Sequence, residues 1–309
     1  MRSCLVIGGY GFIGRELIRL LLASGRKVTV LGRRSQPSAE ISQGCAYVSG
    51  DYGNAGILRG LLTAGIEVID LAYSTVPKTS YGDPVFDLLS NLPASVGLLQ
   101  ECHLAGVSKI VLVSSGGTVY GHSRFLPITE DHPTEPVSPY GITKLTIDRY
   151  AQMFFKTLDL PVAVARPANA YGETQRPGLG QGFLAEAIDA VLHGREVPVF
   201  GAQGSVRDYI HVCDVAAGIL AVLDSGEPGQ VYNIGTGIGT SNLDALEIIK
   251  TLAETNNLSV HYKIMPSRRF DVPANILSSE KLKRDTGWHP FVSLKDGLGN
   301  MWASAFASK

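Results

Sequence analysis

The chain has 309 residues, of which 45% are hydrophobic and 18% are charged, as in an ordinary globular protein. Its formal net charge of −1 at pH 7 gives no reason to expect nucleic acid or an anionic membrane as a partner. No apolar stretch reaches the roughly 20 residues that cross a bilayer, and the amino terminus lacks the pattern of a signal peptide. We therefore expect a cytoplasmic protein.

The four cysteines, at positions 4, 45, 102 and 213, are far apart and form no CxxC pair. This spacing indicates neither a disulfide framework nor a zinc site, so no metal is expected.

Apolar strand-like runs alternate with helical patterns through the first half of the chain. The runs that predict strands cover residues 4–7, 28–31, 46–49, 68–72, 110–113 and 162–165. The patterns that predict helices cover residues 12–24, 90–106 and 140–158. Such alternation indicates βαβ units with right-handed crossovers, so the predicted fold is an α/β, Rossmann-type doubly wound parallel sheet.

The pattern changes after residue 166. Residues 168–207 are rich in Gly, Pro and Gln and contain one predicted helix near 183–193, whereas strand and helix patterns return at 208–223 and 240–254. We predict a Rossmann domain made of residues 1–167 plus about 208–234. A smaller mixed α/β substrate-binding lobe would comprise about 168–207 plus 235–309.

Glycines recur in the first strand-to-helix turn, at Gly8, Gly11 and Gly14. A G-x-x-G-x-x-G turn lets the backbone approach a dinucleotide pyrophosphate, which the next helix attracts with its amino-terminal N–H groups. The alternative is a packing turn that binds no ligand.

The second strand ends in Gly32-Arg33-Arg34, without the carboxylate that usually binds the ribose of NAD. Guanidinium groups suit a 2′-phosphate and favour NADP, unless Arg33 and Arg34 stack on adenine or face water. Asp51, before Tyr52, could accept a hydrogen bond from the adenine amino group or simply form a turn.

Tyr140 and Lys144 lie on one face of a predicted helix that begins with Ser138 as N-cap and Pro139 at its first position. Free tyrosine, with a pKa of about 10, is a poor base at neutral pH. A nearby ammonium and an oxidised nicotinamide would lower that pKa, so this pair is the predicted catalytic centre.

Taken together, these motifs resemble the extended short-chain dehydrogenase/reductase family, and within it the nucleotide-sugar 4-epimerases such as UDP-galactose 4-epimerase. The resemblance covers nearly the whole chain. It is carried by the glycine turn, Ser114-Ser115 through Thr118-Val119-Tyr120-Gly121, Tyr140-x-x-x-Lys144, Asn169, the stretch from Val206 to Asp214, and Arg268-x-x-Asp271.

The resemblance implies a UDP-sugar 4-epimerase that inverts C4 of a UDP-hexose or UDP-N-acetylhexosamine through a 4-keto intermediate, with tightly bound NAD, in a homodimer. The implied catalytic residues are Tyr140, Lys144, Ser115 and Thr118. The implied cofactor-binding residues are Gly8, Gly11, Phe12, Ile13, Gly14, Arg33, Arg34, Asp51, Tyr52, Leu71, Ala72, Tyr73, Asn91, Val113, Ser114, Tyr140, Lys144 and Pro167. The implied substrate-binding residues are Ser115, Gly116, Thr118, Asn169, Gln181, Arg207, Arg268, Asp271 and Asn275.

Three positions depart from patterns known in that family. Gly116 stands where many epimerases carry a Ser or Thr that bonds the substrate hydroxyl. Gly117 and Thr118 stand where related 4,6-dehydratases carry an Asp-Glu pair, so water elimination lacks its acid and base. We therefore interpret the glycines as space cleared beside the sugar, with a plain turn as the alternative, and Asn275 as leaving room for an N-acetyl group.

Two other functions remain open from the sequence. An NADPH-dependent 4-ketoreductase of a nucleotide-linked deoxy sugar is favoured by Gly32-Arg33-Arg34 and would consume external reductant. A binding protein with an inactive site is favoured by Gly116 and opposed by Tyr140 and Lys144. The segment 73–83 would contact the sugar or form a solvated loop.

Overall fold

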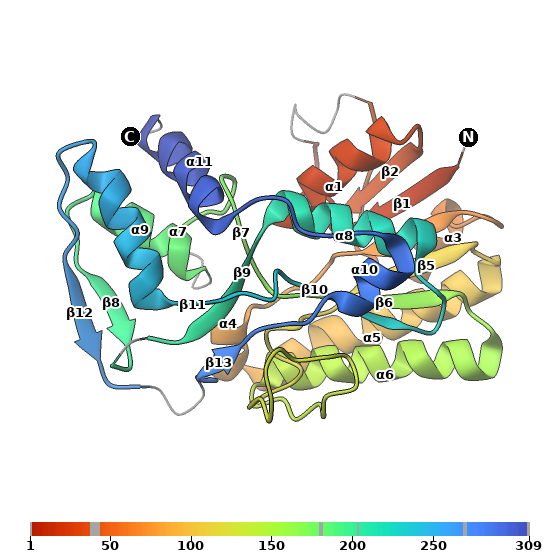
Figure 1. Cartoon of the computed structure of the whole chain (residues 1–309). Coiled ribbons are helices and arrows are strands. Elements are labelled where there is room, and N and C mark those ends of the chain that lie inside the picture. Colours follow the sequence, from red (N-terminus) through yellow and green to blue (C-terminus); the bar gives the residue numbers. More distant parts are fainter. Residues whose placement is uncertain (1, 38–43, 179–181, 203, 268–270, 308–309) are drawn as a thin grey trace.

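A seven-stranded, wholly parallel sheet forms the centre of the protein (Figure 1). The structure, a computed structural model, describes residues 2–37, 44–178, 182–202, 204–267 and 271–307. The strand order is β10-β6-β5-β4-β1-β2-β3. The strands are β1 (Ser3–Ile7), β2 (Lys27–Gly32), β3 (Ala46–Ser49), β4 (Glu67–Asp70), β5 (Lys109–Val113), β6 (Val162–Pro167) and β10 (Val231–Ile234). The predicted Rossmann-type fold is confirmed.

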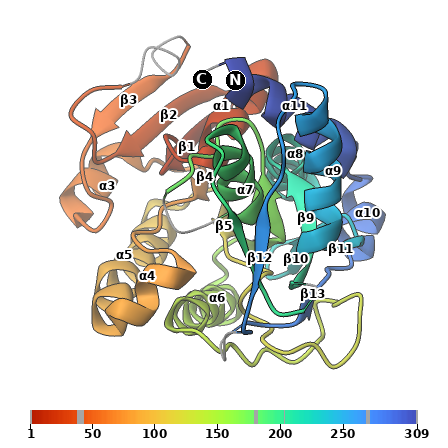
Figure 2. The same cartoon turned by 90° about the vertical axis from the view of Figure 1, so that its left-hand side faces the viewer.

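Helices cover both faces of this sheet, as Figure 2 shows from the side. One face carries α1 (Phe12–Ala23), α8 (Val212–Ser225) and α10 (Glu280–Thr286), and the other carries α3 (Ala55–Leu61), α5 (Pro84–Ala105) and α6 (Pro139–Leu158). Central strands are therefore buried on both faces, which explains their continuous apolar runs. Every residue of β4 and of β6 is buried.

The predicted helix at 90–106 is longer in the structure, because α5 begins at Pro84. Asp83 caps it by accepting a hydrogen bond from the backbone N–H of Phe86 at 2.8 Å. The predicted strand at 68–72 ends early, at Asp70, whose side chain accepts from the N–H of Ala72 and turns the chain. The segment that follows is not a plain loop, because it contains the short helix α4 (Pro77–Gly82).

A second layer of elements lies beyond the carboxyl ends of the strands. It contains β7 (Asn169–Tyr171), β8 (Val197–Phe200), β9 (Val206–His211), β11 (Gly239–Ser241), β12 (Tyr262–Met265), β13 (Ala274–Asn275), α7 (Phe183–Leu192), α9 (Asn242–Glu254) and α11 (Leu294–Ala307). β9 pairs with β7, β11 and β13, and the helices share a core with β8 and β9. The two-part division into residues 1–167 plus about 208–234 and the remaining lobe stays a proposal.

Within the described residues, no helix is long and apolar enough to cross a membrane.

Candidate active site

A cleft of ≈ 1060 Å³ lies where the carboxyl ends of the parallel strands face the second lobe. Ligands of open α/β sheets bind at this edge, and the volume exceeds that of a site for one small ligand. Most of the predicted site residues line it: Gly8, Gly11, Phe12, Ile13, Gly14, Arg34, Leu71, Tyr73, Val113, Ser114, Ser115, Thr118, Tyr140, Lys144, Pro167, Asn169, Arg207 and Asp271. The structure thus brings most of the predicted cofactor-binding and substrate-binding residues into one cavity.

The glycine turn is shaped for a close approach of the backbone. Gly8 has φ +78°, and a Cβ there would lie 2.9 Å from the backbone nitrogen of Ala72. A Cβ on Gly14 would lie 2.5 Å from the carbonyl oxygen of Gly9, which explains the tight contact between turn and helix. Gly11 is the N-cap of α1 and offers no side-chain cap, and the first turn carries no acidic residue. The free N–H groups and the helix dipole therefore suit a pyrophosphate.

Arg34 lines the same cleft beyond the end of β2, with its guanidinium 5.5 Å from the ring centroid of Tyr10. The hydroxyl of Tyr47 donates to the carbonyl oxygens of Gly32 and Arg34, and so holds this turn. Arg33 is exposed and does not line the cleft. Of the two arginines, only Arg34 lines this cleft.

Besides Arg33, four predicted cofactor contacts are not part of the cleft lining. Asp51 forms a turn, because its carboxylate accepts from the N–H of Gly53 at 2.8 Å, and Tyr52 packs on the core of the α5 face. Asn91 is fully buried and accepts from the N–H of Ser74 at 2.8 Å. Ala72 meets the glycine turn through its backbone. These residues support the wall. Asp51 forms the turn that was one of its two predicted roles, and its contact with adenine stays a prediction.

Tyr140 and Lys144 project from the first turns of α6 into the cleft. The helix begins as predicted: the hydroxyl of Ser138 accepts from the N–H of Gly141 at 3.1 Å, and Pro139 is its first residue. Lys144 is 7% exposed, and its Nζ donates to the carbonyl oxygen of Val113 at 2.8 Å, at the end of β5. The same Nζ is 6.0 Å from the ring centroid of Tyr140.

The protein's own groups raise the pKa of the Tyr140 phenol, whereas the sequence predicted that Lys144 and an oxidised nicotinamide would lower it. Burial raises that pKa, and the carboxylate of Asp87 raises it further, while a hydrogen bond from Ser115 lowers it. Lys144 does not reverse this effect, because its ammonium is directed to the carbonyl of Val113.

Burial lowers the pKa of Lys144 to about 8, despite the opposing charges of Asp70, Asp148 and Asp87. The pKa of Asp70 is raised to about 6, because its desolvation outweighs the nearby charge of Lys144. The pKa values of Lys144 and Asp70 therefore both lie near neutral pH.

The glycines at 116 and 117 have different roles, which corrects the interpretation that both clear space beside the sugar. A Cβ on Gly116 would lie 2.3 Å from Cδ1 of Leu277 and 3.0 Å from the carbonyl oxygen of Arg166, so Gly116 is buried in packing. Gly117 lines the cleft, and a Cβ there would meet nothing nearer than Oδ1 of Asn169 at 3.7 Å. Only Gly117 leaves open space.

Asn275 is likewise behind the cleft wall and not on its surface. It is 1% exposed and donates from Nδ2 to the carbonyl oxygen of Gly116 at 3.0 Å. The expectation that Asn275 and Gly116 touch the substrate is therefore corrected, since both belong to the packing beneath the site.

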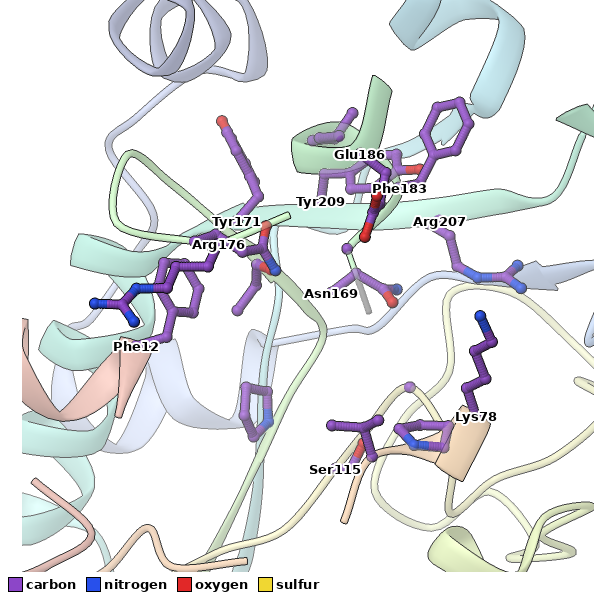
Figure 3. Close-up of a pocket in the computed structure, with 18 of the residues that line it drawn as sticks. Phe12, Lys78, Ser115, Asn169, Tyr171, Arg176, Phe183, Glu186, Arg207 and Tyr209 are labelled. Atoms are coloured by element: carbon purple, nitrogen blue, oxygen red, sulfur yellow. The ribbon is translucent and has the colours of Figure 1, made fainter. Parts of the chain in front are cut away.

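Both sides of the cleft supply polar groups for a ligand (Figure 3). Asn169 Nδ2 and Thr118 Oγ1 are buried and have no hydrogen-bond partner among the described residues, and such atoms normally require one. Arg207 donates to the carbonyl oxygens of Val206 and Val272 at 2.9 and 2.8 Å. Gln181 and Arg268 lie outside the described residues.

Sequence reasoning missed several residues that line the cleft, among them Tyr10, Glu186 and Phe200. Figure 3 shows Lys78 on the same side of the cavity as Arg207, and Arg176 beside Phe12 on the other side. Lys78 lies in the segment that was expected to contact the sugar. No sequence motif points to Glu186 or Phe200. Among the described residues, no group of side chains is arranged to hold a metal ion.

Comparison with known proteins matches residues 4–235 to the NAD dependent epimerase/dehydratase family. The chain belongs to this family. It is 35% identical over 301 residues to the UDP-glucose 4-epimerase of Mycolicibacterium smegmatis, with 95% of each chain covered. The predicted family and the prediction of an enzyme are confirmed.

Two solved structures of the family show how fully the fold is shared. The UDP-glucose 4-epimerase of Thermotoga maritima, with UDP-glucose, has a TM-score of 0.90 at 30% identity and covers 99% of both chains. The dTDP-glucose 4,6-dehydratase of Streptomyces venezuelae, with NAD, has a TM-score of 0.87 at 29% identity and covers 98% of this chain and 96% of its own. Overall similarity therefore does not separate epimerase from dehydratase, and the site residues must do so.

Proposed function

We propose that this protein is a UDP-hexose 4-epimerase that uses bound NAD. The observation that carries the proposal is the placement of Tyr140 and Lys144 in one cleft with the glycine turn and with unpartnered polar atoms of Thr118 and Asn169. The similarity to UDP-glucose 4-epimerases supports the substrate class.

In this proposal Tyr140 removes the proton from the sugar 4-hydroxyl and returns it after the sugar has turned over. NAD, when bound, supplies the acceptor and then the donor of the hydride at C4. Ser115 stabilises the phenolate, since its hydrogen bond lowers the pKa of Tyr140. Lys144 holds a positive charge beside the reacting groups, and Thr118 offers a hydroxyl that Gly116 cannot.

The nucleotide diphosphate would be bound by the lobe. Arg207 and Asn169 face the cleft from β9 and β7, and guanidinium and amide groups suit phosphate oxygens. Gripping the diphosphate while leaving the hexose loosely held would permit the ring to rotate between the two hydride transfers.

Dehydration is disfavoured by the side chains next to Tyr140. Gly117 and Thr118 line the cleft there and provide no carboxyl group for eliminating water. The second candidate, an NADPH-dependent 4-ketoreductase, is favoured by Arg34, whose guanidinium lines the cleft at the end of β2.

Two measurements decide among these activities. Purified protein is denatured and the released dinucleotide identified: NAD supports the epimerase, and NADP or an empty protein weakens it. Separately, UDP-glucose, UDP-N-acetylglucosamine and UDP-glucuronic acid are incubated without reductant and the products analysed by proton NMR for the C4 epimer. Conversion that requires added NADPH would replace the epimerase with the reductase.

Tyr140→Phe removes the proposed base and preserves the ring. We expect turnover to fall by roughly 10²–10⁴-fold, with bound dinucleotide and thermal unfolding unchanged. A Tyr140→Phe protein with normal turnover would remove Tyr140 from the mechanism.

We also infer a cytoplasmic homodimer. Val85, Phe86 and Leu89 on α5 and Ile142 and Met153 on α6 are exposed apolar side chains on two helices that pack side by side, and such surfaces commonly mark interfaces. Sedimentation should give twice the chain mass, and Phe86→Glu should shift it to one chain. A monomeric wild-type protein would contradict this inference.

A further inference from the structure

Tyr73, which follows β4, lies against both members of the Tyr140–Lys144 pair. The Nζ of Lys144 is 4.2 Å from the ring centroid of Tyr73, much nearer than to the Tyr140 ring. The rings of Tyr73 and Tyr140 meet edge-on, with centroids 4.8 Å apart and an interplanar angle of 66°. A single aromatic side chain therefore contacts both reacting groups.

A buried carboxylate holds the other end of Tyr73. The tyrosine hydroxyl is 3.5 Å from Oδ2 of Asp87, which is fully buried on α5. Asp87 also accepts hydrogen bonds from Thr143, at 2.7 Å, and from Thr75. Because Thr143 precedes Lys144 on α6, this network fixes Tyr73 relative to the helix that carries the catalytic pair.

The ammonium of Lys144 makes no ion pair within the described part of the chain. The carboxylates that act on it from three elements are Asp70 on β4, Asp87 on α5 and Asp148 on α6. Its direct contacts are the carbonyl oxygen of Val113 and the face of Tyr73. A cation over an aromatic face is stabilised, and more strongly where water is excluded.

We propose that Tyr73 is a positioning residue that acts through Lys144, holding the ammonium at the end of β5 with its ring face and orienting Tyr140 with its edge contact. The inference rests on the proposed function only in assigning Lys144 and Tyr140 to the chemistry. It assigns to Tyr73 a role separate from any contact with the cofactor.

The role has a measurable consequence for protonation. Burial favours the neutral amine of Lys144, whereas the ring face favours the ammonium. Removing the ring should therefore make Lys144 lose its proton at a lower pH. The alkaline limb of turnover would move in the same direction, because the positive charge beside Tyr140 would disappear earlier.

The test compares Tyr73→Leu, which removes the aromatic face, with Tyr73→Phe, which keeps the face and removes only the hydroxyl. Both full-length proteins are labelled with ¹³C at lysine Cε, and Lys144 is titrated by NMR without substrate, with Lys144→Met identifying its signal. Thermal unfolding checks that each variant is folded, and Tyr73→Trp replaces Tyr73→Leu if that protein does not fold.

We expect the Lys144 midpoint to fall by roughly 0.5–1.5 pH units in Tyr73→Leu. It should stay within about 0.3 units of wild type in Tyr73→Phe, and stay near or rise above wild type in Tyr73→Trp, since indole gives the strongest cation–π contact. Turnover profiles against pH should shift in parallel.

An unchanged midpoint in Tyr73→Leu overturns the proposal, as does an equal shift in Tyr73→Phe, which would assign the effect to the hydroxyl and Asp87. If Tyr73→Trp is used, a Lys144 midpoint that falls by the amount expected for Tyr73→Leu overturns the proposal.

Failure of the proposed function gives a different result. If wild-type protein epimerises none of the three UDP-sugars, the epimerase assignment fails, but the lysine titration still decides the role of Tyr73.

Discussion

Arg26 and Lys144 are both buried basic side chains, 4% and 7% exposed, and they lie at opposite ends of the strands of the same parallel sheet. Arg26 precedes β2, at the amino ends of the strands, and binds Glu67 at 2.6 Å and Asp224 at 2.5 Å. Lys144 lies at the carboxyl ends, where it donates to one backbone carbonyl and faces an aromatic ring.

The pKa values of the two groups shift in opposite directions. Ion pairs with Glu67 and Asp224 outweigh burial and raise the pKa of Arg26, whereas burial lowers the pKa of Lys144 to about 8. At the amino ends of the strands, the charge of Arg26 is thus balanced by carboxylates, and the ion pairs contribute to a defined fold. At the carboxyl ends of the strands, the desolvated ammonium of Lys144 makes no ion pair with a carboxylate of the described residues, which is a costly arrangement that a ligand can use.

The largest expected effect is on turnover. Lys144→Met should reduce it by roughly 10²–10⁴-fold, since the charge beside Tyr140 is lost. Unfolding by urea should change little, because the variant loses one hydrogen bond and also a desolvated charge.

Lys109→Met is the matched control. Lys109 also donates to a backbone carbonyl, that of Gly226, but at the amino end of β5 and outside the cleft. Its replacement should leave turnover intact. Equal losses of activity in the two variants would contradict the assignment of Lys144 to the site.

Arg26→Met should show the reverse pattern. Removing the guanidinium leaves the buried carboxylate of Glu67 with the exposed Arg2, at 3.2 Å, as its remaining ion-pair partner among the described residues. The free energy of unfolding should fall by up to about 3–5 kcal/mol. Turnover per folded molecule should not change. Replacing Glu67 by Leu in the same protein should restore part of the stability, and a single variant as stable as wild type would show that the ion pair contributes nothing.

The sequence predicted the doubly wound sheet well, because its strands are rich in apolar residues and alternate with helical patterns. Local signals such as Ser138 and Pro139 also placed the start of α6 correctly. The predicted boundaries failed where side chains redirect the chain. Asp70 ends β4 early and Asp83 starts α5 early, through hydrogen bonds that periodicity does not contain.

The site was less predictable, because its packing joins residues that are distant in sequence. Nothing near Gly116 indicates that Leu277 fills the space beside it, or that Asn275 binds its carbonyl oxygen. The contact of Tyr73 with Lys144 likewise depends on the pairing of β4 with β5. The motifs predict which groups react, whereas tertiary contacts decide the environment of those groups.

Gly116 and Gly117 are neighbours, but Gly116 is packed behind the cleft and Gly117 lines it, so substitutions at the two positions test these different roles. Gly116→Ser would overlap Leu277 and approach the carbonyl oxygen of Arg166, so it should cost about 1–3 kcal/mol of stability. Gly117→Ser has room and should change stability by less than about 0.5 kcal/mol, while altering the KM for the UDP-sugar. Both are measured by urea unfolding and steady-state kinetics. A stable Gly116→Ser protein with improved turnover would return Gly116 to the site.

The last expected effect is the dependence of stability on pH. Because the pKa of Lys144 is lowered to about 8 in the folded protein from an ordinary value of 10.5, the unfolded chain binds more protons between these values. Stability should therefore rise with pH in this window, by at most about 1.4 kcal/mol per pH unit for one proton. Subtracting the unfolding free energies of Lys144→Met from those of wild type removes most other titrations. The difference should grow from pH 8 to pH 9.5. Lys109→Met is measured beside it, because burial also lowers the pKa of Lys109. A flat difference for Lys144→Met would mean that folding does not lower the pKa of Lys144, so that its charge is balanced as fully as that of Arg26.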